Sequence, residues 1–127
     1  MQENLRENKD IGRGGENLAT DHLIRNGFDI VARNVSYKTG EIDIVAKRGN
    51  ELHFVEVKTR TGTQMVSPLE SITEIKKRRM RRTAQWYLTD SRNNFKDNNL
   101  PQCYFSVIGI EFIDGKPKIE CILDAFV

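Results

Sequence analysis

Residues 40–58 read GEIDIVAKRGNELHFVEVK, a sequence that predicts a β-hairpin. The residues on both sides of Gly49-Asn50 are mostly apolar and β-prone, and Gly-Asn is a typical two-residue hairpin turn. Counting outward from this turn places Asp43 opposite Glu56. Because opposite residues of paired strands lie about 5 Å apart on the same face of a sheet, we expect the two carboxylates to lie side by side.

A lysine follows the second carboxylate on the same face, because Lys58 lies two residues after Glu56. Two adjacent acids repel each other unless a cation lies between them, so a divalent metal is the economical explanation. Oxygen-only ligands favour Mg²⁺ or Mn²⁺ over zinc, which prefers cysteine or histidine. The alternative is an ordinary amphipathic hairpin whose solvent face carries Glu41, Asp43, Glu56 and Lys58, with an ion pair between the last two.

A helix is expected before the hairpin, over Asp10–Asn26, because its apolar residues fall on one arc at about 100° per residue. Glu16 lies at the rim of that arc. One interpretation directs Glu16 across the sheet toward the two carboxylates, as a third acid of the site. The other pairs it with a neighbouring arginine such as Arg13.

A second helix is expected from Ser67, where Ser-Pro-Leu-Glu is typical of a capping box, to Leu88 or Thr89. It carries a dense basic cluster of Lys76, Lys77, Arg78, Arg79, Arg81 and Arg82. Such a cluster wraps around the helix and favours phosphate binding, with an affinity that is sensitive to salt. The alternative is a basic exposed helix that pairs in part with nearby glutamates. Trp86 and Tyr87 are interpreted as packing residues rather than as a base-stacking platform.

The composition and the order of elements predict one domain over residues 1–127. With 38% hydrophobic residues, the chain is long enough for one compact core and too short for two. Strands are expected at Tyr104–Phe112 and Lys118–Leu123, with polar loops at 59–66 and 90–102. The order is therefore α-β-β-β-α-β-β, an α+β domain with a central mixed sheet flanked by helices.

Composition also narrows the class of protein. There is no apolar run of about 18 residues and no basic-then-apolar amino terminus, so we expect no membrane span, no signal peptide and a cytoplasmic location. Cys103 and Cys121 lack the paired spacing of a zinc site and are expected to be reduced thiols. The net charge of +2 does not by itself indicate a nucleic-acid partner.

Five short motifs cover much of the chain and are densest between residues 12 and 60. They are Gly12-Arg-Gly-Gly-Glu16, Gly27-Phe28, Arg33-Asn34, Gly40-Glu-Ile-Asp43 and Phe54-Val-Glu-Val-Lys-Thr-Arg60. Together they resemble the YraN family of small bacterial proteins. That family in turn resembles the PD-(D/E)XK nuclease superfamily and, within it, the Holliday-junction resolvases. The resemblance implies a restriction-endonuclease-like fold and Mg²⁺-dependent hydrolysis of phosphodiester bonds in DNA.

The resemblance also implies a role for each residue of the site. Asp43 and Glu56, with the carbonyl of Val57, would hold Mg²⁺ or Mn²⁺, and Glu16 would bind it through water or help a second ion. Lys58 would orient the attacking water and offset developing charge. Nucleic-acid binding is assigned to Lys76, Lys77, Arg79 and Arg60. A resolvase-like activity would require a homodimer, because two symmetrical strands must be cut.

One position departs from the family pattern. Family members often carry an Arg-x-Asp element on the strand after the long helix, where this chain has Tyr104-Phe105-Ser106. Three classes of function therefore stay open. They are a metal-dependent nuclease acting on structured DNA, a nucleic-acid-binding module that has kept the fold without the chemistry, and an interaction component of a DNA-processing assembly.

Overall fold

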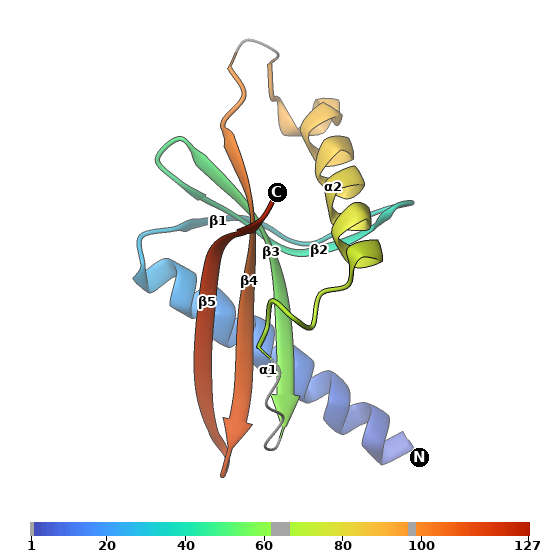
Figure 1. The fold of residues 1–127 in the computed structure, drawn as a ribbon, viewed down its shortest axis with the longest axis vertical. Helices are drawn as coiled ribbons and strands as arrows, with labels where there is room; N and C mark the ends of the chain where they lie inside the picture. The colour runs from blue at the N-terminus through green and yellow to red at the C-terminus, as the bar shows by residue number, and fades with distance from the viewer. Residues whose placement is uncertain (1, 62–66, 97–98) are drawn as a thin grey trace.

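The computed structural model of this chain describes residues 2–61, 67–96 and 99–127, with side chains from residue 14 onward. The elements in these residues are α1 (Gln2–Arg25), β1 (Asp29–Tyr37), β2 (Gly40–Arg48), β3 (Glu51–Thr61), α2 (Glu74–Thr89), the short 3-10 helix η1 (Ser91–Asn93), β4 (Gln102–Ile113) and β5 (Lys116–Phe126) (Figure 1). The predicted order α-β-β-β-α-β-β and the α+β class are confirmed.

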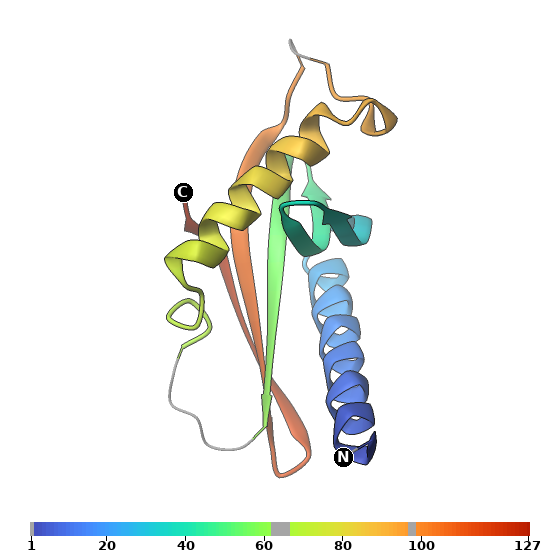
Figure 2. The same cartoon turned by 90° about the vertical axis from the view of Figure 1, so that its right-hand side faces the viewer.

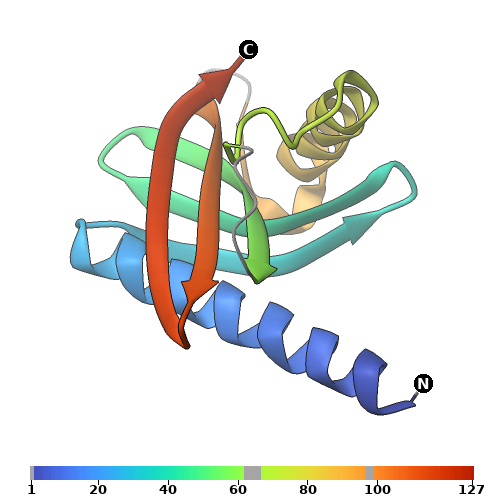
Figure 3. The ribbon, with the colours of Figure 1, turned by 60° about the horizontal axis from the view of Figure 1, so that its bottom comes forward.

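The strands form one mixed sheet in the order β1-β2-β3-β4-β5. Neighbours are antiparallel except β3 and β4, which run parallel and are connected through α2. The β2–β3 hairpin turns at Gly49, whose φ of 60° suits a residue without a Cβ. Its register sets Val45 opposite Phe54, as counting from the turn predicts. Figure 3 shows the β1–β2 hairpin running across the direction of β4 and β5, so the sheet is strongly twisted.

The two helices cover opposite faces of the sheet (Figure 2). On one face, α1 packs Leu23 into a cluster that includes Val55 of β3. On the other face, α2 packs Tyr87 into a cluster that includes Phe54 of the same strand. Because both faces of β3 are covered, its apolar residues follow one another almost without interruption, as is typical of a central strand.

Several elements extend beyond their predicted bounds because of local propensity and strand pairing, including β4 (Gln102–Ile113) and β5 (Lys116–Phe126). α1 begins at Gln2 rather than Asp10, since residues 2–9 are mostly good helix formers. β3 continues to Thr61, through residues predicted as a loop, because it pairs with β4 up to the partners Thr61 and Phe112. The rest of that predicted loop, residues 62–66, lies outside the described residues.

The predicted start of α2 is wrong, because the helix begins at Glu74 and not at Ser67. The cap predicted at Ser67 does form, since its Oγ accepts the N–H of Glu70 at 3.3 Å. It closes only a turn, because Thr73 then has an extended backbone with φ −73° and ψ 160°. The Oγ1 of Thr73 accepts the N–H of Lys76 at 3.1 Å and caps the helix proper.

The approach of α1 to β3 depends on the absence of a side chain at Gly15. A Cβ at this position would lie 2.0 Å from Oγ1 and 3.1 Å from Cβ of Thr59. A Cβ on the preceding Gly14 would meet no described atom within 4 Å. Gly15 therefore sets the distance between helix and strand, immediately before Glu16.

Gly15→Ala is expected to destabilise the protein by about 1 to 3 kcal/mol, because the added methyl group overpacks the contact with β3. Gly14→Ala is the matched control and should stabilise the fold by up to about 1 kcal/mol, since alanine is the better helix former and has room there. Urea unfolding followed by circular dichroism measures both effects. Changes of the same sign and size would contradict the packing role of Gly15.

Candidate metal and nucleic-acid site

Asp43 on β2 is directed at the neighbouring strand. Its Oδ2 accepts a hydrogen bond from the backbone N–H of Val57 at 2.7 Å. The regular β2–β3 pairing reaches Ile44 opposite Val55, and one further step in that register leads from Asp43 to Glu56. The side chain of Asp43 therefore continues the link between the strands beyond the last backbone pair.

Glu56 is buried on β3, with 5% of its surface exposed. Its Oε1 lies 3.7 Å from Nζ of Lys58 on the same strand and 3.5 Å from Nζ of Lys76 on α2. Its Oε2 is also buried and has no hydrogen-bond partner among the described residues. A buried polar atom without a partner is costly, so this oxygen marks a position where a bound cation would be stabilised.

The electrostatic environment links the two carboxylates. Burial raises the pKa of Asp43 to about 7, and the charge of Glu56 is the second cause of that rise. The hydrogen bond from Val57 and the charge of Lys76 lower the pKa, whereas the charge of Glu16 raises it. The fold thus brings Asp43 and Glu56 into electrostatic contact, whereas the charge of Glu16 has a smaller effect on Asp43.

Glu16 lies at the margin of this group. Its Oε2 is 3.5 Å from a terminal guanidinium nitrogen of Arg33 on β1. Both interpretations of the sequence therefore apply in part, since Glu16 pairs with an arginine and its charge also raises the pKa of Asp43. The partner is Arg33, whereas the side chain of Arg13 lies outside the described part of the chain.

The donors of the site fit a hard divalent cation. Asp43 and Glu56 supply carboxylate oxygens, one of them without a partner, and the backbone of Val57 is fixed beside them. Within the described ranges, no three His, Cys, Asp or Glu side chains are grouped closely enough to hold a metal. Two carboxylates are a donor set compatible with Mg²⁺, because this ion is commonly bound by one or two carboxylates together with waters and substrate phosphates.

The basic cluster of α2 separates into two sets. Lys76, Lys77 and Arg81 are held by Glu56, Glu74 and the backbone oxygen of Val127, respectively. Arg78, Arg79 and Arg82 are exposed and line, together with Lys38, a hollow of about 370 Å³. Among the residues assigned to nucleic-acid binding, Arg79 therefore faces solvent, whereas Lys76 belongs to the carboxylate site and Lys77 to an ion pair on its own helix.

Arg60 lies on β3, two residues beyond Lys58. Both residues line a small cavity of about 60 Å³, together with Glu111 and Lys118. The ring of Pro68 also lines this cavity. Arg60 thus lies near Lys58, in surroundings that carry both signs of charge.

Ser106, where the chain departs from the family pattern, points away from the carboxylate pair. Glu56 pairs with Val107, the next residue of β4, so Ser106 faces the opposite side of the sheet. Its Oγ lies 2.9 Å from Nδ1 of the buried His53 and accepts the N–H of Asp124 at 3.2 Å. Ser106 thus supports the irregular pairing of β4 with β5. It makes no contribution to the face of the sheet that carries Glu56.

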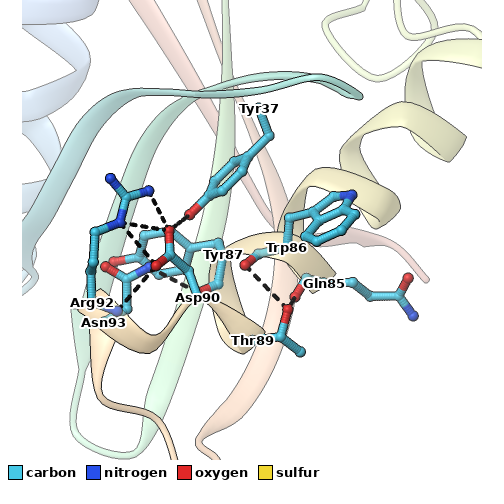
Figure 4. Close-up of polar contacts among 8 residues, drawn as sticks. All are labelled: Tyr37, Gln85, Trp86, Tyr87, Thr89, Asp90, Arg92 and Asn93. Carbon is cyan, nitrogen blue, oxygen red and sulfur yellow. Dashed lines mark hydrogen bonds and ion pairs between the residues drawn. The ribbon is translucent and has the colours of Figure 1, made fainter.

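Trp86 and Tyr87 have different environments. Tyr87 is buried, as predicted for a packing residue, but Trp86 is 56% exposed, so the packing prediction for Trp86 is wrong. Successive residues of a helix are rotated by about 100°, and this rotation places Trp86 on the side of α2 that carries Arg82. Figure 4 shows the two aromatic rings leaving the end of α2 in different directions.

The fold and the site together define a class of protein. It is an α+β protein whose mixed sheet carries the buried Glu56 and, on the neighbouring strand, the half-buried Asp43, with lysines from a strand and from a helix beside Glu56. None of the described helices has the length and apolar character needed to cross a membrane.

The family follows from comparison with known proteins. The family model described as "Uncharacterised protein family UPF0102" matches residues 15–110, which include Glu16, Asp43, Glu56 and Lys58. The chain therefore belongs to the UPF0102 family, which confirms the resemblance to the YraN proteins.

Similar proteins occur in distantly related bacteria. A UPF0102 protein of Symbiobacterium thermophilum is 39% identical, over 91% of this chain and 95% of that protein. One from Syntrophomonas wolfei is 37% identical, over 94% and 99% of the two chains. One from Chlorobium chlorochromatii is 41% identical, over 92% and 91%. The similarity in each case covers nearly the whole length of both proteins.

Removing the charge of Asp43 is expected to stabilise the metal-free protein at high pH. The pKa of this carboxyl rises from its ordinary 3.8 to about 7 on folding, so the folded state holds the proton more tightly. The resulting stabilisation is complete below about pH 4 and is lost as the pH rises through about 7. Asp43→Asn should therefore gain on the order of 2 to 4 kcal/mol relative to wild type between about pH 4 and about pH 8.

Urea unfolding in EDTA at a series of pH values measures this difference. The amide of the Asp43→Asn variant would keep an oxygen that accepts the N–H of Val57, so the variant should retain the fold. Glu41→Gln, at an exposed position of the same strand, is the matched control and should differ from wild type by a nearly constant amount. A constant difference for Asp43→Asn as well would contradict the proposed environment of Asp43.

Proposed function

We propose that the protein is a metal-dependent nuclease that hydrolyses phosphodiester bonds in branched DNA. The observation that carries the proposal is the buried Glu56 with the half-buried Asp43 on the neighbouring strand, where Oε2 of Glu56 has no partner among the described residues. Lys58 lies 3.7 Å from the other oxygen of Glu56. Two acids and a lysine on neighbouring strands are suited to hydrolysis assisted by Mg²⁺. The resemblance to PD-(D/E)XK nucleases supports the same assignment of these residues.

In the proposed hydrolysis, each residue of the site has a role that fits its position. A divalent cation held by Asp43 and Glu56 supplies Lewis acidity toward a phosphoryl oxygen and a more acidic water. Lys58 orients the attacking water and offsets the charge that develops on the phosphorus centre. Lys76, which is 3.5 Å from Oε1 of Glu56, holds that carboxylate in place from the side of α2. Glu16, paired with Arg33, acts from the margin of the site through water.

Cleavage of a labelled four-way junction, with linear duplex alongside, tests the proposal in Mg²⁺ and in Mn²⁺. Wild type is expected to cut the junction. Asp43→Asn and Glu56→Gln should lower the rate by about 100-fold or more, because each removes charge stabilisation of the transition state. Glu41→Gln, the exposed control, should cut as wild type does.

Calorimetric titration with Mn²⁺ alone gives a readout that does not depend on the choice of DNA substrate. Wild type should bind the ion and Asp43→Asn should bind it much more weakly. Absence of junction cleavage together with Mn²⁺ binding that is unaffected by Asp43→Asn would overturn the nuclease assignment.

A second candidate function is nucleic-acid binding without cleavage. It is favoured by the two lysines within 4 Å of Glu56, since they already offset part of its charge without a metal. It is also favoured by the exposed Arg78, Arg79 and Arg82 on α2, which suit phosphate contacts. For this second function, the affinity of the protein for DNA should fall as the salt concentration rises, and DNA binding should persist in EDTA.

Arg82→Gln is expected to weaken DNA binding and to lower the slope of log affinity against log salt concentration by about one, because one phosphate contact is lost. Arg25→Gln is the matched control, since Arg25 is exposed at the end of α1 on the opposite face of the sheet. Anisotropy of labelled duplex DNA over a range of salt concentrations in EDTA measures both. Equal slopes for the two variants would place the phosphate contacts elsewhere than on α2.

A further inference from the structure

The outward side of α2 carries a continuous surface that the carboxylate site does not use. The exposed residues recur at the spacing of helix turns, namely Ile75, Arg78, Arg79, Arg82, Gln85, Trp86 and Thr89. The first part of this surface is cationic and the last part is aromatic. Arg82 connects them, because it lines both the cationic hollow of about 370 Å³ and a second hollow beyond it.

The second hollow is larger and mostly apolar. It has a volume of about 720 Å³ and is lined by Trp86, Leu88, Phe95 and Leu100 in addition to Arg82. Trp86 is 56% exposed and Leu100 is 49% exposed. A hollow of this size, with apolar walls and a few polar groups, is typical of sites that bind a small molecule or one unit of a polymer.

The charged residues described in the lining of both hollows are all cationic. None of the described residues that line them is acidic. Arg78, Arg79, Arg82 and Lys38 make no ion pair within the described ranges. A polyanion is the ligand that complements four such cations next to an exposed indole ring.

The end of α2 that carries Trp86 is held in place by contacts with other segments. The helix end is held by Asp90, whose Oδ2 accepts the hydroxyl hydrogen of Tyr37 at 2.7 Å (Figure 4). The side chain of Asn93 donates to the backbone oxygen of Tyr87 at 2.8 Å. The ring of Phe95 lies 5.9 Å from that of Tyr87, which anchors one wall of the hollow to the core.

We infer that this surface binds an unpaired nucleotide segment of single-stranded DNA, with a base stacked on Trp86 and the adjoining phosphates held by Arg82 and Arg79. The face of a base is available for stacking on a side chain only where the strand is unpaired, because in a duplex each base face is covered by its neighbours. The inference rests on the nucleic-acid part of the proposed function and is independent of the metal site. It assigns the substrate class as DNA with single-stranded segments.

A second copy of the chain complements the same surface less well than a DNA strand does. In a two-fold dimer each copy presents the same patch to the other. Pairing this surface with itself would bring the cations of both copies together without acids among the lining residues to offset them. A negatively charged strand meets no such repulsion.

The test uses Trp86 as its own probe, because it is the only tryptophan of the chain. Wild type in EDTA is titrated with a short oligothymidylate, with an abasic oligonucleotide of the same length and with duplex DNA. The fluorescence emission of Trp86 should be quenched by the oligothymidylate, and much less by the abasic oligonucleotide or by duplex DNA. The oligothymidylate should bind about 5- to 100-fold more tightly than the abasic strand, which keeps the phosphates but offers no base.

Variants are compared by anisotropy of labelled strands. Trp86→Ala should lower the affinity for oligothymidylate to that for the abasic strand and leave duplex binding unchanged, whereas Trp86→Phe should retain most of the preference. The side chain is exposed, so both variants should unfold at nearly the wild-type urea concentration. Arg82→Gln should weaken binding of all three ligands, since phosphates are common to them.

Three results would overturn the inference. Equal affinity of wild type and Trp86→Ala for oligothymidylate would remove the stacking site, and junction cleavage dependent on Asp43 would then still support the nuclease. Self-association that is lost in Trp86→Ala would assign the surface to a second copy of the chain. Absence of binding to any DNA at low salt would remove both the stacking site and the nucleic-acid part of the proposed function.

Discussion

Burial of the Glu56 carboxylate on the central strand is the constraint on which the rest of the structure depends. A charged group that is only 5% exposed must be offset nearby. Lysines from β3 and α2 lie 3.7 and 3.5 Å from its Oε1. The placement of α2 is therefore tied to this carboxylate as well as to the apolar cluster around Tyr87. Asp43 adds a second acid beside the first, and its pKa remains raised although the charge of Lys76 lowers it.

The raised pKa of Asp43 gives the site its chemical character. Burial and the charge of Glu56 raise the pKa of Asp43 to about 7, so the ionised pair is disfavoured in the metal-free protein at neutral pH. A bound cation would reverse the sign of that effect and stabilise both carboxylates in their charged form. Groups whose local environment opposes stability are expected at functional sites rather than elsewhere in a fold. Ser106 shows the contrast, since its hydroxyl is satisfied by His53 and by the backbone of Asp124.

α2 connects the two proposed functions because its three sides have different contacts. One side packs against the sheet through Met80 and Tyr87. A second side directs Lys76 to Glu56. The third presents Arg79, Arg82 and Trp86 to solvent. DNA bound on the outer side would therefore be held by the same helix that pairs with a carboxylate of the proposed metal site, which would be a direct physical route between the proposed binding and the proposed chemistry.

The sequence by itself determined the order of elements and the register of the β2–β3 hairpin, because the two-residue period of a strand and the Gly49-Asn50 turn are local properties. It also indicated the pairing of Asp43 with Glu56, which follows from that register. Only the tertiary structure decided that Lys76 pairs with Glu56, that Ser106 faces away from the site, and that Trp86 is exposed. The first and third features depend on how α2 is rotated against the sheet, and the second depends on the parallel register of β3 with β4. Contacts between segments far apart in the chain set both, and no short sequence pattern encodes them.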